Sequence, residues 1–178
     1  MQNSMRSAKS LDNRASIAAA ILALRELRDH KNRATVHFVA TSQEEFTGLG
    51  ARISSNRLDI KCAIVLDVTF GNQPDLAETE SFALENGPAI GRGGFIPDKL
   101  YRLLVDAAKA LEIPYQIEPM PSVTGTDIDT IAFNREGIPC ALISIPVRYM
   151  HTPVEVVSLK DIERASRLLA EFVKRWSG

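Results

Sequence analysis

Two short runs of almost entirely apolar residues constrain the fold of this chain more than any other feature. Residues 62–66 read Cys-Ala-Ile-Val-Leu, and residues 140–145 read Cys-Ala-Leu-Ile-Ser-Ile. Runs of this length without polar alternation are typical of central parallel strands that helices cover on both faces. Because helical patterns lie between the predicted strands, we expect a mostly parallel sheet between two helical layers, a three-layer α/β/α sandwich.

Other elements follow from periodicity and from glycine and proline positions. Ile17, Ile21 and Leu24 recur at helical spacing, which predicts that they form the inward face of a helix beginning at Asp12. The polar residues 1–9 show no pattern, so we expect the folded domain over residues 10–178. We predict further strands at 34–41 and 115–118, further helices at 48–54, 97–107, 127–133 and 159–176, and a long loop at 69–86.

Composition excludes several classes of protein. The chain has 178 residues, enough for one domain, a net charge of -1, and 24% charged residues of mixed sign, so nothing indicates a nucleic-acid partner. No apolar run approaches the roughly 20 residues of a membrane span, and the N-terminus lacks a secretory pattern. We interpret Cys62 and Cys140 as small buried hydrophobes, in preference to a disulfide or a metal pair, and expect a cytoplasmic protein.

Side chains of the types that bind metal ions recur where predicted strands end or helices begin. Glu44 and Glu45 follow the strand at 34–41, Asp67 follows the apolar run at 62–66, His151 follows the second run, and Asp12 stands at a helix start. Ligands of open α/β sheets bind outside the carboxyl ends of the strands. Carboxylates and an imidazole gathered there suit zinc, and also cobalt or manganese. One glutamate can then bind metal while its neighbour acts as general base.

Each residue also has a simpler interpretation. A Glu-Glu pair near a helix start is often solvated, and Asp12 alone is more often a helix cap. We interpret His37, between Val36 and Phe38, as a core histidine, and His30 as a solvated residue at a helix end. The glycines at 91–94 fit no phosphate-binding spacing and are interpreted as a turn.

Several segments resemble those of the M42 family of metallo-aminopeptidases in their sequence and in their order along the chain. The similar segments are Lys-Ser-Leu-Asp-Asn-Arg at 9–14, Gln-Glu-Glu at 43–45 with Gly50-Ala51, Leu-Asp-Val-Thr at 66–69, Gly-Pro-Ala-Ile at 87–90, Gly-Thr-Asp at 125–127, and Ile-Ser-Ile-Pro-Val-Arg-Tyr-Met-His-Thr-Pro at 143–153. The last segment is the most specific of them. The resemblance implies a zinc-peptidase-like fold and removal of N-terminal residues from peptides.

The resemblance also implies roles for the candidate residues. Two divalent metals, zinc or cobalt, would share Asp12 as a bridging ligand. Glu45 and His151 would complete one metal site, Asp67 would serve the other, and Glu44 would be the general base.

This sequence departs from the family in two important respects. Family members carry a His-x-Asp motif that supplies a further ligand of the second metal, followed by an inserted β-rich dimerisation domain, and this chain contains neither. We therefore expect the carboxyl-terminal part of the catalytic domain, without its first strands, with one metal bound more firmly than the other. A homo-oligomer or a complementing N-terminal fragment would cover the exposed sheet edge. The alternatives are a catalytically dead remnant acting as a binding or assembly subunit and, with less support, glycan cleavage.

Overall fold

Strand β5 (Cys140–Arg148) forms the centre of the sheet in the computed structural model, which describes residues 4–31 and 34–177. It pairs in parallel with β2 (Ala63–Phe70) and antiparallel with both β3 (Ala89–Gly93) and β6 (Glu155–Ser158). β1 (Met5–Ala8) extends the sheet beyond β6, and β4 (Gln116–Met120) extends it beyond β3. Within the described residues the sheet therefore has six strands, and its central strand is buried except for the half-buried Arg148.

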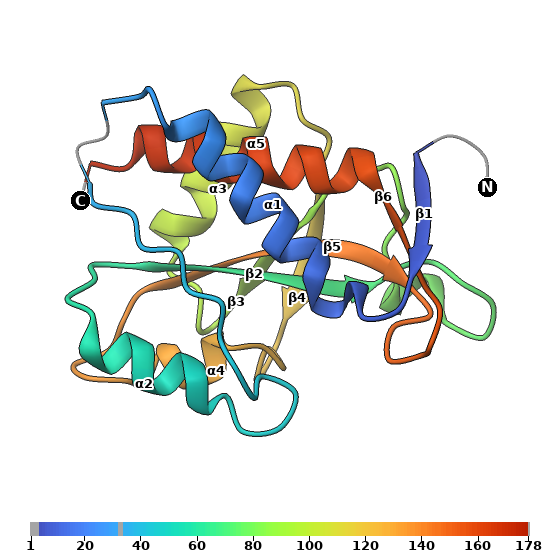
Figure 1. Cartoon of the computed structure of the whole chain (residues 1–178), viewed down its shortest axis with the longest axis horizontal. Coiled ribbons are helices and arrows are strands. Elements are labelled where there is room, and N and C mark those ends of the chain that lie inside the picture. Colours follow the sequence, from blue (N-terminus) through green and yellow to red (C-terminus); the bar gives the residue numbers. More distant parts are fainter. Residues whose placement is uncertain (1–3, 32–33, 178) are drawn as a thin grey trace.

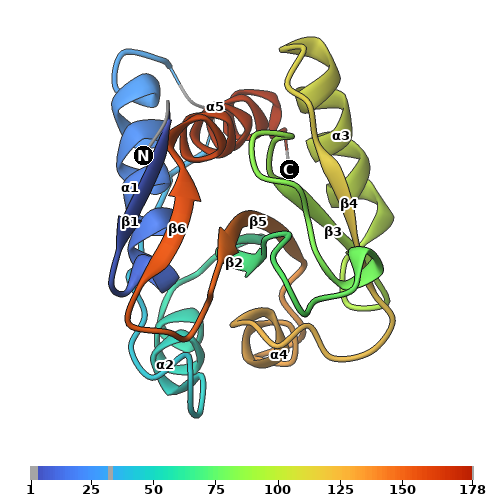
Figure 2. The same cartoon turned by 90° about the vertical axis from the view of Figure 1, so that its right-hand side faces the viewer.

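Helices cover both faces of this sheet, so the expected three layers are present. The helices are α1 (Leu11–Leu27), α2 (Leu49–Arg57), α3 (Asp98–Ala110), α4 (Ile128–Ile131) and α5 (Leu159–Arg175), with a 3-10 turn at Glu78–Glu80. Figure 1 and Figure 2 place α1, α3 and α5 on one face and α2 and α4 on the other. Every helix among the described residues is too short or too polar to cross a bilayer.

The sheet is mixed, whereas the sequence predicted a mostly parallel one. The pairs β2–β5 and β3–β4 are parallel, whereas β1–β6, β5–β6 and β3–β5 are antiparallel. A parallel pair needs a long crossover connection. The few residues between β5 and β6 permit only a reversal of chain direction, so this pair must be antiparallel.

The predicted strand at residues 34–41 is wrong. This segment forms no strand, and Val36, His37, Phe38 and Val39 are exposed. The interpretation of His37 as a core histidine fails for the same reason. A β-branched segment becomes a strand only where another strand and a covering layer accept it. Among the described residues, β2 pairs in the sheet only with β5, and no ladder forms with the segment at 34–41.

Three strands, β1, β3 and β6, form where the sequence predicted none. β1 lies within the polar segment at 1–9, of which residues 1–3 are outside the described range. β3 includes glycines that we interpreted as a turn. At Gly93 an added Cβ would lie 2.0 Å from the Met120 carbonyl oxygen, so this glycine is required by close approach of the neighbouring strand.

Helix α1 turns a different face inward from the one that periodicity predicted. Ala15, Ala19 and Ala23 are buried, whereas Ile17 and Ile21 are 40% and 42% exposed. The alanines let α1 lie close to α5, and Leu27, which continues the predicted stripe, is buried with Ala23 against Ala170 of α5. An apolar stripe that contains Ile17 and Ile21 is therefore exposed on α1.

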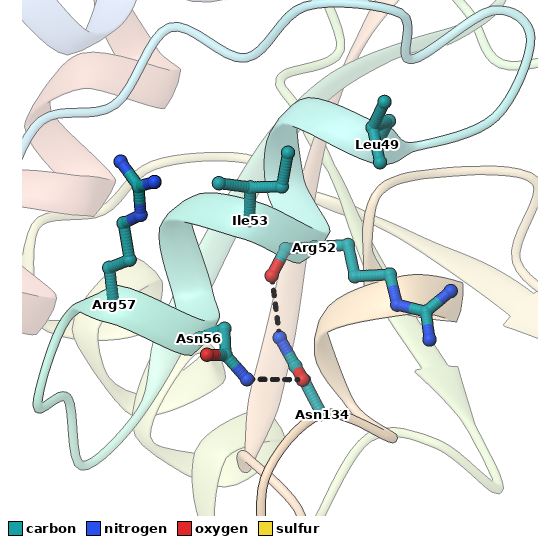
Figure 3. A pocket seen from close by; sticks show the side chains of 6 residues that line it. All are labelled: Leu49, Arg52, Ile53, Asn56, Arg57 and Asn134. Carbon is teal, nitrogen blue, oxygen red and sulfur yellow. Dashed lines mark hydrogen bonds between the residues drawn. The ribbon is translucent and has the colours of Figure 1, made fainter.

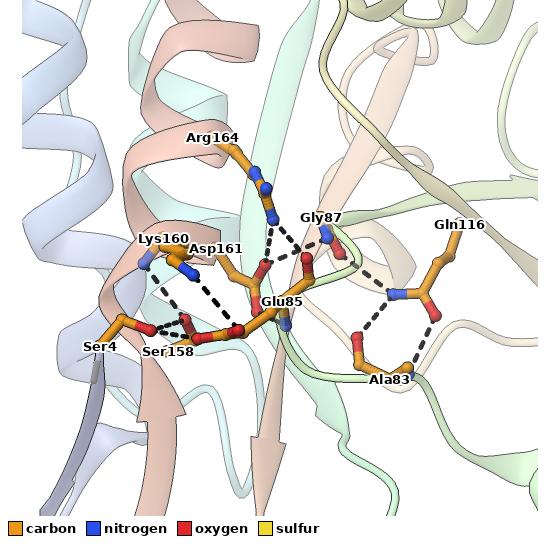
Figure 4. A network of polar contacts seen from close by, with 9 residues as sticks. All are labelled: Ser4, Ala83, Glu85, Gly87, Gln116, Ser158, Lys160, Asp161 and Arg164. Carbon is orange, nitrogen blue, oxygen red and sulfur yellow. Dashed lines mark hydrogen bonds and ion pairs between the residues drawn. The ribbon is translucent and has the colours of Figure 1, made fainter. Parts of the chain in front are cut away.

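The long loop before β3 is fastened to the start of α5 (Figure 4). The carboxylate of the buried Asp161 accepts the backbone N–H groups of Glu85, at 2.6 Å, and Gly87, at 3.1 Å. Arg164 donates to the Glu85 carbonyl at 2.5 Å. Burial raises the pKa of Asp161, and these donors oppose the rise. The loop thus has a fixed attachment to the helical layer.

Candidate metal centre

Three of the predicted ligands converge, although they come from distant segments. His151 Nε2 lies 3.1 Å from Asp12 Oδ2 and 3.4 Å from Glu45 Oε2. One ligand atom from each residue lies within 4.8 Å of the other two. The side chain of Asp12 is 9% exposed, whereas those of His151 and Glu45 are 58% and 62% exposed. The cluster therefore has a buried wall and an open side.

The donor set and its spacing fit a divalent ion. Ligand atoms about 2.1 Å from a tetrahedral zinc ion lie about 3.4 Å from one another. The two contacts of His151 Nε2, at 3.1 and 3.4 Å, are close to that separation. Zinc accepts carboxylate oxygens and imidazole nitrogens, and three protein ligands leave its fourth position open, as in catalytic zinc sites.

Asp12 occupies a corner between β1 and the regular part of α1. Its backbone dihedrals are not helical (φ -79°, ψ 105°), so it stands just outside the helix. The pKa of Asp12 rises to about 6, first because the group is buried, then because of the charge and hydrogen-bonding contact of Glu45; His151 opposes the rise. Negative groups are therefore crowded here.

Turns with positive φ present the other two ligands. His151 has φ 63°, and Tyr149 in the same loop has φ 59°. Before Glu45, Gln43 has φ 61°, and its carbonyl accepts the N–H groups of Thr47 at 3.0 Å and Gly48 at 2.8 Å. Non-glycine residues with positive φ carry backbone strain, and strain of this kind clusters at functional sites.

Glu44 lies beside the three converging residues. Its pKa rises to about 7 because it is partly buried and because the charges of Asp127, Glu45 and Asp12 act on it, with His151 opposing. A carboxylate with a pKa near neutrality is suited to accept a proton at physiological pH.

Asp67 is separate from the three converging ligands. It lies inside β2, is 7% exposed, and its Oδ1 accepts N–H groups from Asn13 Nδ2 and from the Val68 backbone, both at 2.8 Å. Burial raises its pKa to about 8; the Val68 N–H opposes this, and the charges of Glu44 and Asp12 add to it. Charges at the site therefore act on the pKa of Asp67, but Asp67 is not part of the three-residue group.

Asp127 is a site residue that the sequence analysis did not assign. Its Oδ2 accepts the Thr41 hydroxyl at 2.7 Å, and its charge is the largest of those acting on Glu44. The buried Oδ1 has no hydrogen-bond partner within the described residues. The only signal in the sequence was its place in the Gly-Thr-Asp segment, where a carboxylate before a helix is usually a cap.

Glu155 was also missed. It opens β6, and its carboxylate accepts backbone N–H groups from both the Asp12 corner and the His151 loop. The sequence placed it in no motif, because its role depends on where two distant backbones meet.

One surface hollow lies away from these residues. This depression has a volume of about 310 Å3 and is lined by Leu49, Arg52, Ile53, Asn56 and Arg57 of α2 and by Asn134. Figure 3 shows how these side chains lie. None of the predicted ligands lines it. The candidate site is thus identified by its side-chain chemistry.

Comparison with known proteins links this geometry to a family. The sequence profile described as M42 glutamyl aminopeptidase matches residues 1–168. A lysyl aminopeptidase of Pyrococcus furiosus is 40% identical over 158 residues, which are 89% of this chain and 45% of that protein.

Solved structures agree with this comparison. An aminopeptidase of the archaeon Desulfurococcus kamchatkensis has a TM-score of 0.91 at 35% identity, and a TET aminopeptidase of a Thaumarchaeota archaeon has 0.91 at 31%. Each match covers 99% of this chain and 51% of the other. The chain thus spans about half the length of the relatives it matches.

Proposed function

The chain belongs to the M42 glutamyl aminopeptidase family, and from this premise we propose that it carries the metal-binding part of a divalent-metal-dependent aminopeptidase. Such an enzyme removes N-terminal residues from peptides. The observation that carries the proposal is the convergence of Asp12, Glu45 and His151. The names of the relatives, which are aminopeptidases, support the reaction class.

The three converging residues would hold one ion. Zinc and cobalt fit this mixture of carboxylate and imidazole, and manganese is the next candidate. Asp67, with Asp12, would serve a second ion, which we expect to bind more weakly because this chain offers it only two carboxylates. A divalent ion held there supplies a Lewis acid for peptide hydrolysis.

Glu44 is the proposed general base. It lies next to the ligand Glu45, and its pKa of about 7 lets it take a proton from the attacking water near neutral pH. Asp127 adds negative charge on the same side. A cationic group, such as the free amino group of a peptide, would be attracted to this side of the site.

Calorimetric titration of zinc into the metal-free chain tests the site. We expect one firm binding event in the wild type and a loss of affinity in Glu45→Gln and His151→Ala. Glu80→Gln and His30→Ala change an exposed acid and an exposed histidine elsewhere and serve as matched controls. Unchanged binding in both site variants would count decisively against the metal centre.

Peptide hydrolysis needs a separate assay. A panel of aminoacyl-anilides with zinc or cobalt would be offered to the chain alone and mixed with a chain carrying a His-x-Asp segment. We expect weak or absent turnover alone and higher turnover in the mixture. Glu44→Gln should remove the gain while leaving zinc binding in place.

The second candidate is a catalytically dead subunit that acts in binding or assembly. The exposed apolar stripe of α1 and the exposed segment at 34–41 favour it, because apolar patches of this kind mark interaction surfaces. A homo-oligomer or a complementing fragment would cover them. Stable association without turnover under any metal or partner would favour this candidate over the enzyme.

A further inference from the structure

Glu155 connects the two backbone segments that carry Asp12 and His151. One carboxylate oxygen, Oε2, accepts the N–H of Leu11 at 2.5 Å and the N–H of Asp12 at 3.0 Å. The other oxygen, Oε1, accepts the N–H of His151 at 3.0 Å. Glu155 is 2% exposed. A single buried side chain thus bonds to the main chain of two candidate ligands.

These backbone groups have few other partners available. Asp12 lies at a non-helical corner, and the positive φ of His151 takes its residue out of the β5–β6 ladder. Neither N–H is therefore satisfied by regular secondary structure. Buried N–H groups require an acceptor, and a carboxylate is a strong one.

The strands on either side fix the position of Glu155 itself. Its backbone pairs with Ala8 of β1, and the next residue, Val156, pairs with Arg148 of β5. Glu155 therefore starts from a rigid part of the sheet and reaches the two irregular segments that flank it. Neither segment has regular structure of its own at the ligand.

We propose that Glu155 is a positioning residue that sets the separation of Asp12 and His151 by holding their backbones on opposite oxygens of one carboxylate. The inference rests on the proposed metal centre. In this role Glu155 hydrogen-bonds to the main chains of both ligands, and its charge also helps to raise the pKa of the Asp12 carboxyl. Partners that orient metal ligands in this way commonly change metal affinity by about 10- to 100-fold when they are removed.

Two variants distinguish the effect of the length of the Glu155 side chain from the effect of its charge. Glu155→Gln keeps the shape but replaces one accepting oxygen with a donor, so it cannot serve both segments. Glu155→Asp keeps the charge but withdraws the carboxylate by one methylene. Glu163→Gln removes a charge from an exposed position on α5 and is the control.

Zinc affinity, measured by competition with a coloured chelator on folded metal-free protein, is the first readout. We expect a loss of about 10- to 100-fold in both Glu155→Gln and Glu155→Asp and none in Glu163→Gln. The visible spectrum of bound Co2+ should also differ from that of the wild type in both variants. A role limited to general stability would lower the melting temperature and leave both readouts unchanged.

The other outcomes overturn the proposal in distinguishable ways. If the wild type binds no zinc, the proposed metal centre fails and the positioning role fails with it. If the wild type binds zinc and both variants bind it equally well, only the positioning role fails. If Glu155→Asp retains full affinity while Glu155→Gln loses it, the effect is one of charge and positioning is wrong.

Hydrogen exchange of the wild-type amides keeps the test decisive should both variants fail to fold. The amides of Leu11, Asp12 and His151 should exchange at least about tenfold more slowly than those of the exposed segment at 34–41. Fast exchange at these three amides would overturn the proposal.

Discussion

The Nε2 atom of His151 lies 3.1 Å from the Oδ2 atom of Asp12 and 3.4 Å from an oxygen of Glu45. Burial and the neighbouring Glu45 raise the pKa of Asp12 to about 6. Without a cation, the ionised Asp12 opposes folding, and with a cation it becomes a ligand. The ionised Asp12 therefore lowers the stability of the metal-free protein but favours the binding of a metal ion.

Asp12→Asn should accordingly make the metal-free protein more stable at pH 8, by about 1 kcal/mol or roughly 3 °C in Tm. Its zinc affinity should fall at least about tenfold, because an amide is a poorer ligand than a carboxylate. Thermal unfolding and calorimetry measure the two effects. Asp106→Asn, at an exposed position on α3, should change neither. A variant that loses stability and keeps zinc affinity would contradict this account.

The metal-free protein should lose stability as the pH rises from about 5 to 8. The pKa of Asp67 is raised from 3.8 to about 8, and that of Glu44 from 4.5 to about 7. Between these values the folded state holds more protons than the unfolded state, so the free energy of unfolding falls with increasing pH. Allowing for partial exposure, we expect a loss of about 2 kcal/mol, or roughly 5 °C in Tm.

Thermal scans at pH 5.5 and 8.0 measure this effect. Saturating zinc should reduce or reverse the trend, because the metal binds the deprotonated ligands. Asp67→Asn should flatten the pH dependence of the metal-free protein. A Tm that rises steadily over this range without metal would show that these carboxyls are not held in the raised-pKa state.

Local sequence patterns were sufficient where the apolar positions of an element meet covering layers of the sheet or of the helices. The apolar runs predicted β5 and β2, and the stripe containing Ile162, Ala165 and Phe172 predicted α5. For these elements, the layers that cover them lie in the described part of the chain, and they meet the apolar positions from which the elements were predicted. The convergence of Asp12, Glu45 and His151 also follows from the rule that functional groups gather at one edge of such a sheet.

Patterns failed where tertiary partners decide the outcome. The segment at 34–41 has a strand-like composition, but no described strand pairs with it. On α1, the size of the alanines decides which face meets α5, and periodicity alone selected the larger residues. Asp127 and Glu155 matter because of contacts with remote backbone or charge, which spacing in the sequence does not encode.

Asn13→Ala tests how Asp67 is held. Asn13 Nδ2 donates to Asp67 Oδ1 at 2.8 Å and to the Leu66 carbonyl at 3.2 Å. Removing this amide leaves a buried carboxyl with one donor fewer, so the free energy of unfolding should fall by about 1–3 kcal/mol. Urea denaturation measures it. Asn56→Ala, whose side chain makes only an exposed 3.4 Å bond to Asn134, should cost less than about 0.5 kcal/mol. Equal losses would mean that Asn13 does not support Asp67.

Lysine substitutions on α1 test which face of the helix is free. Ile21 is 42% exposed, whereas Ala19 is fully buried against the core. Ile21→Lys should change the free energy of unfolding by no more than about 0.5 kcal/mol, because the ammonium group reaches water. Ala19→Lys should cost more than about 3 kcal/mol, because it places a long charged side chain in a close helix contact.

Denaturation of the two variants, with sedimentation velocity of the first, distinguishes the possibilities. If the outward stripe is a contact surface, Ile21→Lys should also reduce self-association or binding to a complementing chain, since it adds a charge where an apolar contact is needed. If Ile21→Lys unfolds the protein as severely as Ala19→Lys, the isoleucine face is the inward one, as periodicity alone predicted. If it alters neither stability nor association, the stripe is solvated and does not support an assembly role.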